Sequence, residues 1–392
     1  MTLTAEQAAT RGLRDALPAL LSLALASALA VTTEMLPVGL LPDLGRALGV
    51  SDATTGLLVG LYAVMVAVFA VPLTIATSRL PRKPLVLATV AGYAVCNTTV
   101  ALAPTFAVVA AGRVVGGLTH ALFFALIIGY SPRLVSRAHV GRALAIAGSG
   151  VSAGLVLGVP LLTSLGVAAG WRTPFIALAV LSVATLVLVG VFLPPVANTG
   201  QTPVREPGRR RQLTAVASSN LLVFVGHFGA YTFISLLLLS SGVSPAMLGP
   251  ILLGCGACGL VGLWYAGRGL DRNPRRTTLI LLIATMAAVA LLGVSWPALV
   301  GVLVATALWC GAFGGVPALY QACAVRTQAV SPERAGAWVN AVSNVGIAGG
   351  SALGAALLGT VGLGALPWAG IVLMVAGTVV AALSRNAFPA RP

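Results

Sequence analysis

Apolar runs long enough to cross a lipid bilayer recur along the whole chain of 392 residues, and they restrict its fold more than any other feature. An α-helix rises about 1.5 Å per residue, so about 20 apolar residues cross a hydrocarbon core of about 30 Å. Charged residues make up only 8% of the chain, whereas a soluble domain carries about 25%. We therefore predict an all-α integral membrane protein. Its twelve transmembrane helices are expected at 15–42, 52–77, 84–103, 105–130, 140–166, 172–194, 214–240, 245–268, 276–296, 297–322, 332–360 and 365–384.

Two features of the chain repeat with one constant offset of 193 positions. The segment 49–56 reads GVSDATTG and the segment 242–249 reads GVSPAMLG. The same offset places the basic stretch at 79–83 on the basic stretch at 272–276. A constant offset across two separate features indicates a tandem duplication, and internal repeats in an apolar chain are typical of membrane transporters.

The duplication predicts two pseudo-symmetric halves joined by a polar linker. The linker, PPVANTGQTPVREPGRRRQ at 195–213, is rich in Pro, Gly and Arg, as flexible connections are. We expect an N-terminal six-helix bundle at 1–194 and a C-terminal six-helix bundle at 214–392. The first span lacks a short apolar core with a cleavage site, so we expect it to be retained rather than removed as a signal peptide.

The net charge of +15 is distributed as in a multi-pass membrane protein. With both termini on one side, 23 basic residues sort so that all but Arg46, Arg113 and Arg172 lie on that side. Because Lys and Arg of short loops stay in the cytoplasm, both termini are expected to be cytoplasmic. This pattern argues against nucleic acid as a partner. Arginine far outnumbers lysine, and this bias suggests a GC-rich bacterium. We also expect a monomeric protein in the bacterial inner membrane, with the lipid bilayer as its surroundings.

No motif of enzyme chemistry occurs in the chain. Its five cysteines and three histidines show no zinc spacing, and neither a phosphate-binding loop nor a hydrolase nucleophile elbow is present. We therefore expect no catalysis, no cofactor and no metal.

Glu34 is the only one of the eight acidic residues that lies deep in a predicted span. It precedes Pro42 by eight residues, and therefore lies roughly 12 Å below the outer end of the first predicted helix. An ionisable side chain in the membrane is costly and usually functional. Burial favours the neutral form of a carboxyl, so Glu34 could load and release a proton. Alternatively, it is a protonated carboxyl held by hydrogen bonds for structure.

Arg113 is the only deep cation, at a depth similar to that of Glu34 on a helix that runs the opposite way. It could approach Glu34 and compete with a proton for the carboxylate, or it could satisfy carbonyl groups at a helix break. His120 lies seven residues later on the same helical face. It is either a packed neutral imidazole or a polar contact.

His227 falls on Glu34 when the two halves are superimposed, and Tyr231 lies one turn further along the same helix. Pseudo-equivalent polar groups suit a binding site at the interface of two repeats. The alternative is that both side chains bridge neighbouring helices.

Glycines spaced four residues apart predict close helix packing in two spans, because small residues let helices approach closely in lipid. These glycines are Gly150, Gly154 and Gly158 in the first half, and Gly346, Gly350 and Gly354 in the second.

Several segments together resemble one family. They are TEMLPVGLLP at 33–42, GRVVGGLTHALFF at 112–124, LGVPLLTSLGVAAGWRTPF at 157–175, GHFGAYTFI at 226–234 and NVGIAGGSALG at 344–354. By these segments the chain resembles the twelve-span drug:proton antiporters of the major facilitator superfamily, close to the arabinose-efflux-like and purine-efflux-like permeases. The fifth-helix segment lacks the Gly-Pro pair of that branch at 154–155, although Pro160 follows Gly158.

The resemblance implies two six-helix bundles around a central cavity that opens alternately to each side. It implies multidrug-type efflux of a small, fairly apolar compound by proton antiport, with Glu34 carrying the proton and Arg113 assisting its release. We expect the substrate cavity to include Met35, His120, Phe124, His227, Tyr231, Trp309, Asn340 and Asn344. Alternatives are an uncoupled facilitator for a sugar or nucleoside, and a non-transporting membrane receptor or scaffold.

The cytoplasmic loop motif G-x-x-x-D-R-x-G-R-[RK] of the family is incomplete in the first half. TIATSRLPRK at 74–83 carries Ser78 where the family has Asp, whereas GRGLDRNPRR at 267–276 keeps its acid. We expect a weaker gate in the first half and a resting bias towards the inward-open state. The gate residues that the resemblance implies are Arg79, Arg82, Lys83, Asp271, Arg272 and Arg275.

Overall fold

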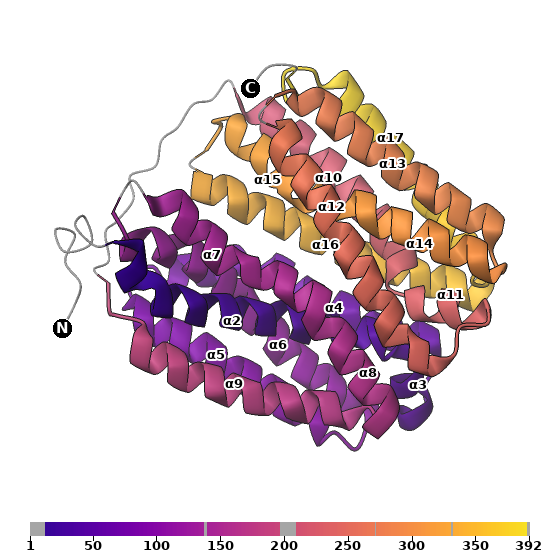
Figure 1. The fold of residues 1–392 in the computed structure, drawn as a ribbon, viewed down its shortest axis with the longest axis horizontal. Helices are drawn as coiled ribbons and strands as arrows, with labels where there is room; N and C mark the ends of the chain where they lie inside the picture. The colour runs from indigo at the N-terminus through magenta and orange to yellow at the C-terminus, as the bar shows by residue number, and fades with distance from the viewer. Residues whose placement is uncertain (1–11, 137–138, 197–208, 271, 331, 390–392) are drawn as a thin grey trace. The chain divides into compact units, whose positions relative to one another are not determined.

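A computed structural model describes residues 12–136, 139–196, 209–270, 272–330 and 332–389, which are almost entirely helical (Figure 1). Within these residues, twelve helical segments are long and apolar enough to cross a membrane, and this confirms the predicted number of spans. The segments are Leu13–Gly39, Asp52–Ala76, Arg82–Ala101, Phe106–Leu134, Val140–Ala169, Arg172–Phe192, Arg210–Tyr231, Pro245–Leu270, Pro274–Ser295, Leu299–Arg326, Arg334–Thr360 and Ala365–Leu383.

The first and seventh spans end earlier than the sequence predicts. Helix α2 (Leu13–Gly39) stops before Leu40, and a short helix α3 (Leu41–Leu48) follows, with Pro42 in its first turn. The seventh span divides into α10 (Arg210–Tyr231) and α11 (Ile234–Ser240). Pro42 therefore begins a separate helix and does not mark the end of the first span. After α3 and α11, Gly49 and Gly242 both adopt a positive φ, of 67° and 93°, so both repeats turn at a glycine in this region.

The fifth span is also interrupted. Between α7 (Val140–Ala153) and α8 (Val159–Ala169), residues Gly154–Gly158 form a π-helical segment. Pro160 lies in the first turn of α8, where its missing N–H removes a donor from the helical ladder. A π-helical turn is one way for a helix to accommodate such a break.

The contacts within the chain group into two compact units. The first unit comprises residues up to Leu36 together with Val68–Thr202, and the second comprises Pro37–Ala67 together with residues from Pro203 onward. Helices α2 and α4 (Asp52–Ala76) both continue across this division. The predicted bundle boundaries at the linker remain a prediction, and much of the linker lies outside the described residues.

In the first unit, α5 (Arg82–Ala101) packs against both α6 (Phe106–Tyr130) and α9 (Arg172–Phe192). The glycines of α7 and the π-helical segment face α2 closely enough to exclude side chains. A Cβ on Gly150 would lie 1.9 Å from the Ala24 carbonyl oxygen, and one on Gly154 would lie 2.7 Å from that of Ala28. A Cβ on Gly158 would meet the hydroxyl of Thr32 at 2.1 Å.

In the second unit, α10 packs against α16 (Pro332–Thr360) and α17 (Ala365–Leu383). The glycines of α16 face α10 in the same manner. A Cβ on Gly350 would lie 2.7 Å from the Val225 carbonyl oxygen, and one on Gly354 would lie 2.3 Å from that of Gly229. A Cβ on Gly346 would lie 2.5 Å from the Cβ of Phe224. The first and fifth spans thus pack as their counterparts, the seventh and eleventh, do.

The remaining spans of the second unit pack against one another. Helix α12 (Leu248–Leu270) packs against α14 (Leu299–Phe313), and α13 (Pro274–Ser295) packs against both α14 and α17. Helix α15 (Val316–Arg326) continues the tenth span after α14.

Candidate functional site

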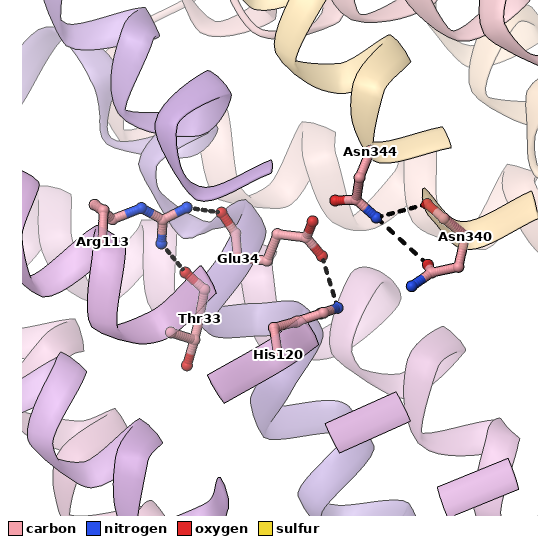
Figure 2. Close-up of polar contacts among 6 residues, drawn as sticks. All are labelled: Thr33, Glu34, Arg113, His120, Asn340 and Asn344. Carbon is pink, nitrogen blue, oxygen red and sulfur yellow. Dashed lines mark hydrogen bonds and ion pairs between the residues drawn. The ribbon is translucent and has the colours of Figure 1, made fainter. Parts of the chain in front are cut away.

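The Glu34 carboxyl lies in the buried interior of the first unit. Its side chain comes from α2, near the end of the helix, and Glu34 is 7% exposed. Its Oε2 lies 3.7 Å from Nε2 of His120 on α6 (Figure 2). This distance exceeds that of a direct hydrogen bond, so the pair is a loose electrostatic contact that a small movement could tighten.

Arg113 lies beside Glu34 but binds its main chain, not its carboxylate. Nη1 donates to the Thr33 carbonyl oxygen at 2.6 Å, and Nη2 donates to the Glu34 carbonyl oxygen at 2.7 Å (Figure 2). Of the two interpretations that the sequence leaves open, these distances match the satisfaction of carbonyl groups. Arg113 is 1% exposed, and a guanidinium in such surroundings keeps its charge.

The sequence of α2 leaves one of the carbonyls that Arg113 binds without its usual helical donor. In an α-helix, the carbonyl of Thr33 would accept from the N–H four residues later, at position 37. That residue is Pro37, which has no N–H to donate. Pro37 of the TEMLP segment and Arg113 of α6 therefore act together. The proline frees a carbonyl inside the membrane, and the guanidinium binds it.

Polar and aromatic groups of α5 and α6 complete the surroundings of Glu34. Asn97 on α5 donates through Nδ2 to the hydroxyl oxygen of Thr33 at 3.0 Å and to the carbonyl oxygen of Tyr93 at 2.9 Å. The His120 ring stands edge-on to Tyr93, with centroids 6.4 Å apart, and lies against Phe124 at 4.8 Å. The next residue of α2, Met35, is buried. We call Glu34, Arg113, His120 and Asn97 the acid cluster.

The chemistry of the acid cluster follows from one fixed charge and one exchangeable proton. Arg113 stays cationic and is anchored by two carbonyls, so it attracts the Glu34 carboxylate whenever that group ionises. Protonation of Glu34 removes the negative charge and leaves the cation in place. The cluster can therefore bind and release a proton without moving its cation.

The second unit gathers His227 and Tyr231 of α10 with aromatic residues of α14. The imidazole of His227 stacks on Phe313, with centroids 3.4 Å apart, and on Tyr231 at 4.9 Å. Trp309 meets the imidazole edge-on at 5.0 Å. Phe313 has no place among the residues expected from the sequence, although it lies one helical turn after Trp309.

Asn340 and Asn344 lie one turn apart on α16 in the second unit. Nδ2 of Asn344 donates to the carbonyl oxygen of Asn340 at 2.9 Å and to its Oδ1 at 3.4 Å (Figure 2). Oδ1 of Asn344 is buried, and no group in the described part of the chain donates to it. The amide pair therefore keeps a free acceptor.

Two basic residues from the predicted gate motifs cap helix ends within their own units. Nζ of Lys83 donates to the Gly190 carbonyl oxygen at 2.7 Å, in the last turn of α9. Nη2 of Arg275 donates to the Ala382 carbonyl oxygen at 2.6 Å, in the last turn of α17. A cation at a helix C-terminus satisfies free carbonyls and complements the helix dipole.

The other gate residues differ in how far they are exposed to solvent. Arg79 and Arg272 are exposed, and Arg82 is half-buried at the start of α5. Asp271 lies outside the described residues.

A family comparison agrees with this architecture. The family model for the Major Facilitator Superfamily matches residues 23–331. The chain belongs to the major facilitator superfamily. In the solved structures, a D-xylose–proton symporter superimposes with a TM-score of 0.74, at 14% identity over 95% of this chain and 98% of that one. At such identity the likeness shows the fold alone.

Several curated relatives of the chain are named for efflux or for drug resistance. A chloramphenicol efflux pump of Mycobacterium tuberculosis is 32% identical over 86% of this chain and 84% of the relative. A chloramphenicol resistance protein of Streptomyces lividans is 32% identical over 89% of this chain and 92% of the relative. A probable sugar efflux transporter of Mannheimia succiniciproducens is 29% identical over 87% of each chain. This chain is thus a superfamily member with efflux-pump relatives.

Proposed function

We propose that this protein is a secondary active transporter that exports a small, fairly apolar organic compound in exchange for protons. The observation that carries the proposal is the buried Glu34 carboxyl, 3.7 Å from His120 and beside a guanidinium that binds main-chain carbonyls. Because Arg113 is committed to the backbone, it does not occupy the carboxylate oxygens. They remain available to a proton.

Glu34 carries the proton in this mechanism, and Arg113 lowers the cost of releasing it. An ionised carboxylate in a medium of low dielectric constant is strongly disfavoured unless a cation lies nearby. Arg113 supplies that cation in every state of the cycle. His120, whose Nε2 lies 3.7 Å from the Glu34 carboxyl, is the acceptor to which the proton can pass.

The driving force is sufficient for a single proton. One charge that crosses about 100 mV releases about 2.3 kcal/mol. This corresponds to a roughly fifty-fold concentration ratio of an uncharged substrate before any pH difference adds to it. One coupling carboxyl therefore suffices for one-for-one exchange.

The names of the relatives support export of a drug-like or metabolite-like compound. We also propose that the protein is a monomer in a bacterial inner membrane. The distribution of its basic residues favours cytoplasmic termini. An uncoupled facilitator for a sugar or nucleoside remains the main competing outcome.

Transport in proteoliposomes tests proton coupling. Radiolabelled chloramphenicol, a probe suggested by the relatives, is followed across membranes with and without an imposed pH gradient. We expect the gradient to drive accumulation by the wild-type protein, and Glu34→Gln to abolish this effect while the protein remains folded. The matched control is Asp43→Asn, since Asp43 pairs with the exposed Arg46 on α3 and takes no part in the acid cluster.

Two results would contradict the proposal. If Glu34→Gln still accumulates the probe in response to the gradient, Glu34 is not the proton carrier. If the wild-type protein equilibrates substrate and ignores the gradient, the protein is a facilitator.

A further inference from the structure

The facing sides of α10–α11 and α14 in the second unit form a narrow strip of aromatic and hydroxyl side chains. We call it the aromatic seam, and it consists of His227, Tyr231, Ser235, Thr306, Trp309 and Phe313. Residue numbers run in opposite directions along its two sides, because Phe313 meets His227 and Trp309 meets Tyr231. Ser235 and Thr306 lie one turn further along these two sides, and α11 does contact α14.

Four polar atoms of the aromatic seam are buried, and no group in the described chain bonds to them. They are Nδ1 of His227, Oγ of Ser235, Oγ1 of Thr306 and Nε1 of Trp309. Their residues are at most 3% exposed. Buried polar atoms without partners are rare and costly, so four along one helix contact require an explanation.

Several other Ser and Thr hydroxyls in or beside helices of this chain are hydrogen-bonded, unlike those of the aromatic seam. Thr278 and Thr285 on α13 donate to the carbonyl four residues earlier, at 2.8 Å in both cases. Ser241, just after α11, does the same at 2.8 Å. Ser235 and Thr306 lack this bond although they also lie in helices. Their hydroxyls remain available to a ligand.

The chemistry of the aromatic seam defines its ligand. The Trp309 N–H is a donor only, so it requires an acceptor, whereas the hydroxyls and the imidazole nitrogen accept or donate. None of the six members carries a fixed charge, so an ionic ligand would find no counter-ion among them. The imidazole lies nearly parallel to both neighbours, at 5° to Phe313 and 20° to Tyr231. The imidazole fills the slot that these rings define, and a ligand that replaces it there has to be a flat ring and not a puckered sugar.

We propose that the aromatic seam recognises the transported substrate, and that this substrate is an uncharged, planar aromatic compound with a hydrogen-bond acceptor for Trp309. This inference rests on the proposed export function and assigns the substrate class. Tyr231 is the member that is only half-buried, so the ligand reaches the seam past its ring. The ligand ring enters the slot as His227 turns aside, and its polar groups bond to the free atoms.

The test is equilibrium binding to the purified full-length protein in lipid nanodiscs, without a pH gradient. Four probes are compared by thermal stabilisation and by competition with one another: chloramphenicol, benzamide, cyclohexanecarboxamide and L-arabinose. Benzamide and cyclohexanecarboxamide share one polar group and differ in whether their ring is flat. We expect chloramphenicol and benzamide to bind, and both non-aromatic probes to bind at least tenfold more weakly.

Trp309→Phe keeps an aromatic ring and removes the donor. We expect it to weaken binding of chloramphenicol by about tenfold, the effect of one lost hydrogen bond to a buried donor. The matched control is Trp264→Phe, since Trp264 lies on α12 with its side chain exposed and should change binding less than twofold. Unchanged thermal stability of the ligand-free variants shows that both remain folded.

The proposal is overturned if the aromatic probes fail to bind, if L-arabinose or cyclohexanecarboxamide binds as well as they do, or if Trp309→Phe binds like the wild type. Failure of proton coupling gives a different result. In that case aromatic probes bind as expected, while a pH gradient does not drive their transport.

Discussion

The pairing of Arg113 with Pro37 makes a quantitative prediction about stability. If Arg113 serves a carbonyl that Pro37 leaves without a donor, then an N–H at position 37 should make Arg113 less necessary. The perturbation is a double-mutant cycle of Arg113→Met and Pro37→Ala. Methionine keeps an unbranched, though shorter, side chain and cannot donate a hydrogen bond.

The magnitude follows from the two bonds, at 2.6 and 2.7 Å. A hydrogen bond to a charged group contributes about 1.5–3 kcal/mol. Removing Arg113 also relieves the cost of burying a cation, so we expect Arg113→Met to destabilise the protein by about 2–4 kcal/mol. The part due to the Thr33 carbonyl, about 1–2 kcal/mol, should disappear when alanine at position 37 provides an N–H.

The measurement is the free energy of unfolding in mixed detergent micelles titrated with sodium dodecyl sulfate, followed by circular dichroism. The cycle cancels any effect of the Arg113 charge on Glu34, because that effect is present in both arms. Pro18→Ala is the control. Pro18 also lies in α2, but the carbonyl four residues before it belongs to Arg14. A coupling energy below about 0.5 kcal/mol between Arg113→Met and Pro37→Ala would refute the reasoning.

Three further predictions concern packing, gating and capping. Gly154→Leu should sharply reduce the yield of folded protein, because even a Cβ at this position would lie 2.7 Å from the Ala28 carbonyl oxygen. Gly148→Leu is the control, because the space around Gly148 is open and the yield should not fall. Size-exclusion profiles of the two variants measure the difference. Ser78→Asp should shift accessibility labelling of a single-cysteine reporter towards the outward-open state, and an unchanged labelling pattern would count against the weak-gate hypothesis. Asn273→Ala should cost about 1 kcal/mol of unfolding free energy, because the Asn273 side chain caps α13 by accepting from the Arg276 N–H at 2.9 Å.

The number of spans could be predicted from the sequence because it depends on a property of single segments. A run of apolar residues has the length that the bilayer requires, whatever packs around it. The tandem offset was equally informative, since Gly49 and Gly242, which it places on one another, both adopt a positive φ. The close helix contacts of Gly154 and Gly350 follow from spacing alone for the same reason.

The bonds of Arg113 could not be predicted, because they depend on contacts between segments about 80 residues apart. Depth in the membrane places Arg113 level with Glu34 but does not choose between a carboxylate and a carbonyl. Pro37 was the available clue, since a proline always removes the donor for the carbonyl four residues earlier. The aromatic stack on His227 likewise depends on which face of α14 turns towards α10, and the uniformly apolar sequence of α14 does not reveal this.

The choice of arginine at position 113 has a consequence for the proton cycle. One guanidinium bridges two successive carbonyls because its donors are arranged in a rigid fork, and one of those carbonyls belongs to Glu34 itself. The cation therefore stays beside the carboxyl in both protonation states. Loading a proton changes the net charge of the acid cluster, and the two bonds from Arg113 to the backbone do not have to break first. A lysine would keep the charge, but its single ammonium is a point donor that would have to leave one carbonyl in order to follow the carboxylate. Arg113 thus holds α2 through its two hydrogen bonds and eases proton release from Glu34 through its charge. It does both from one fixed position.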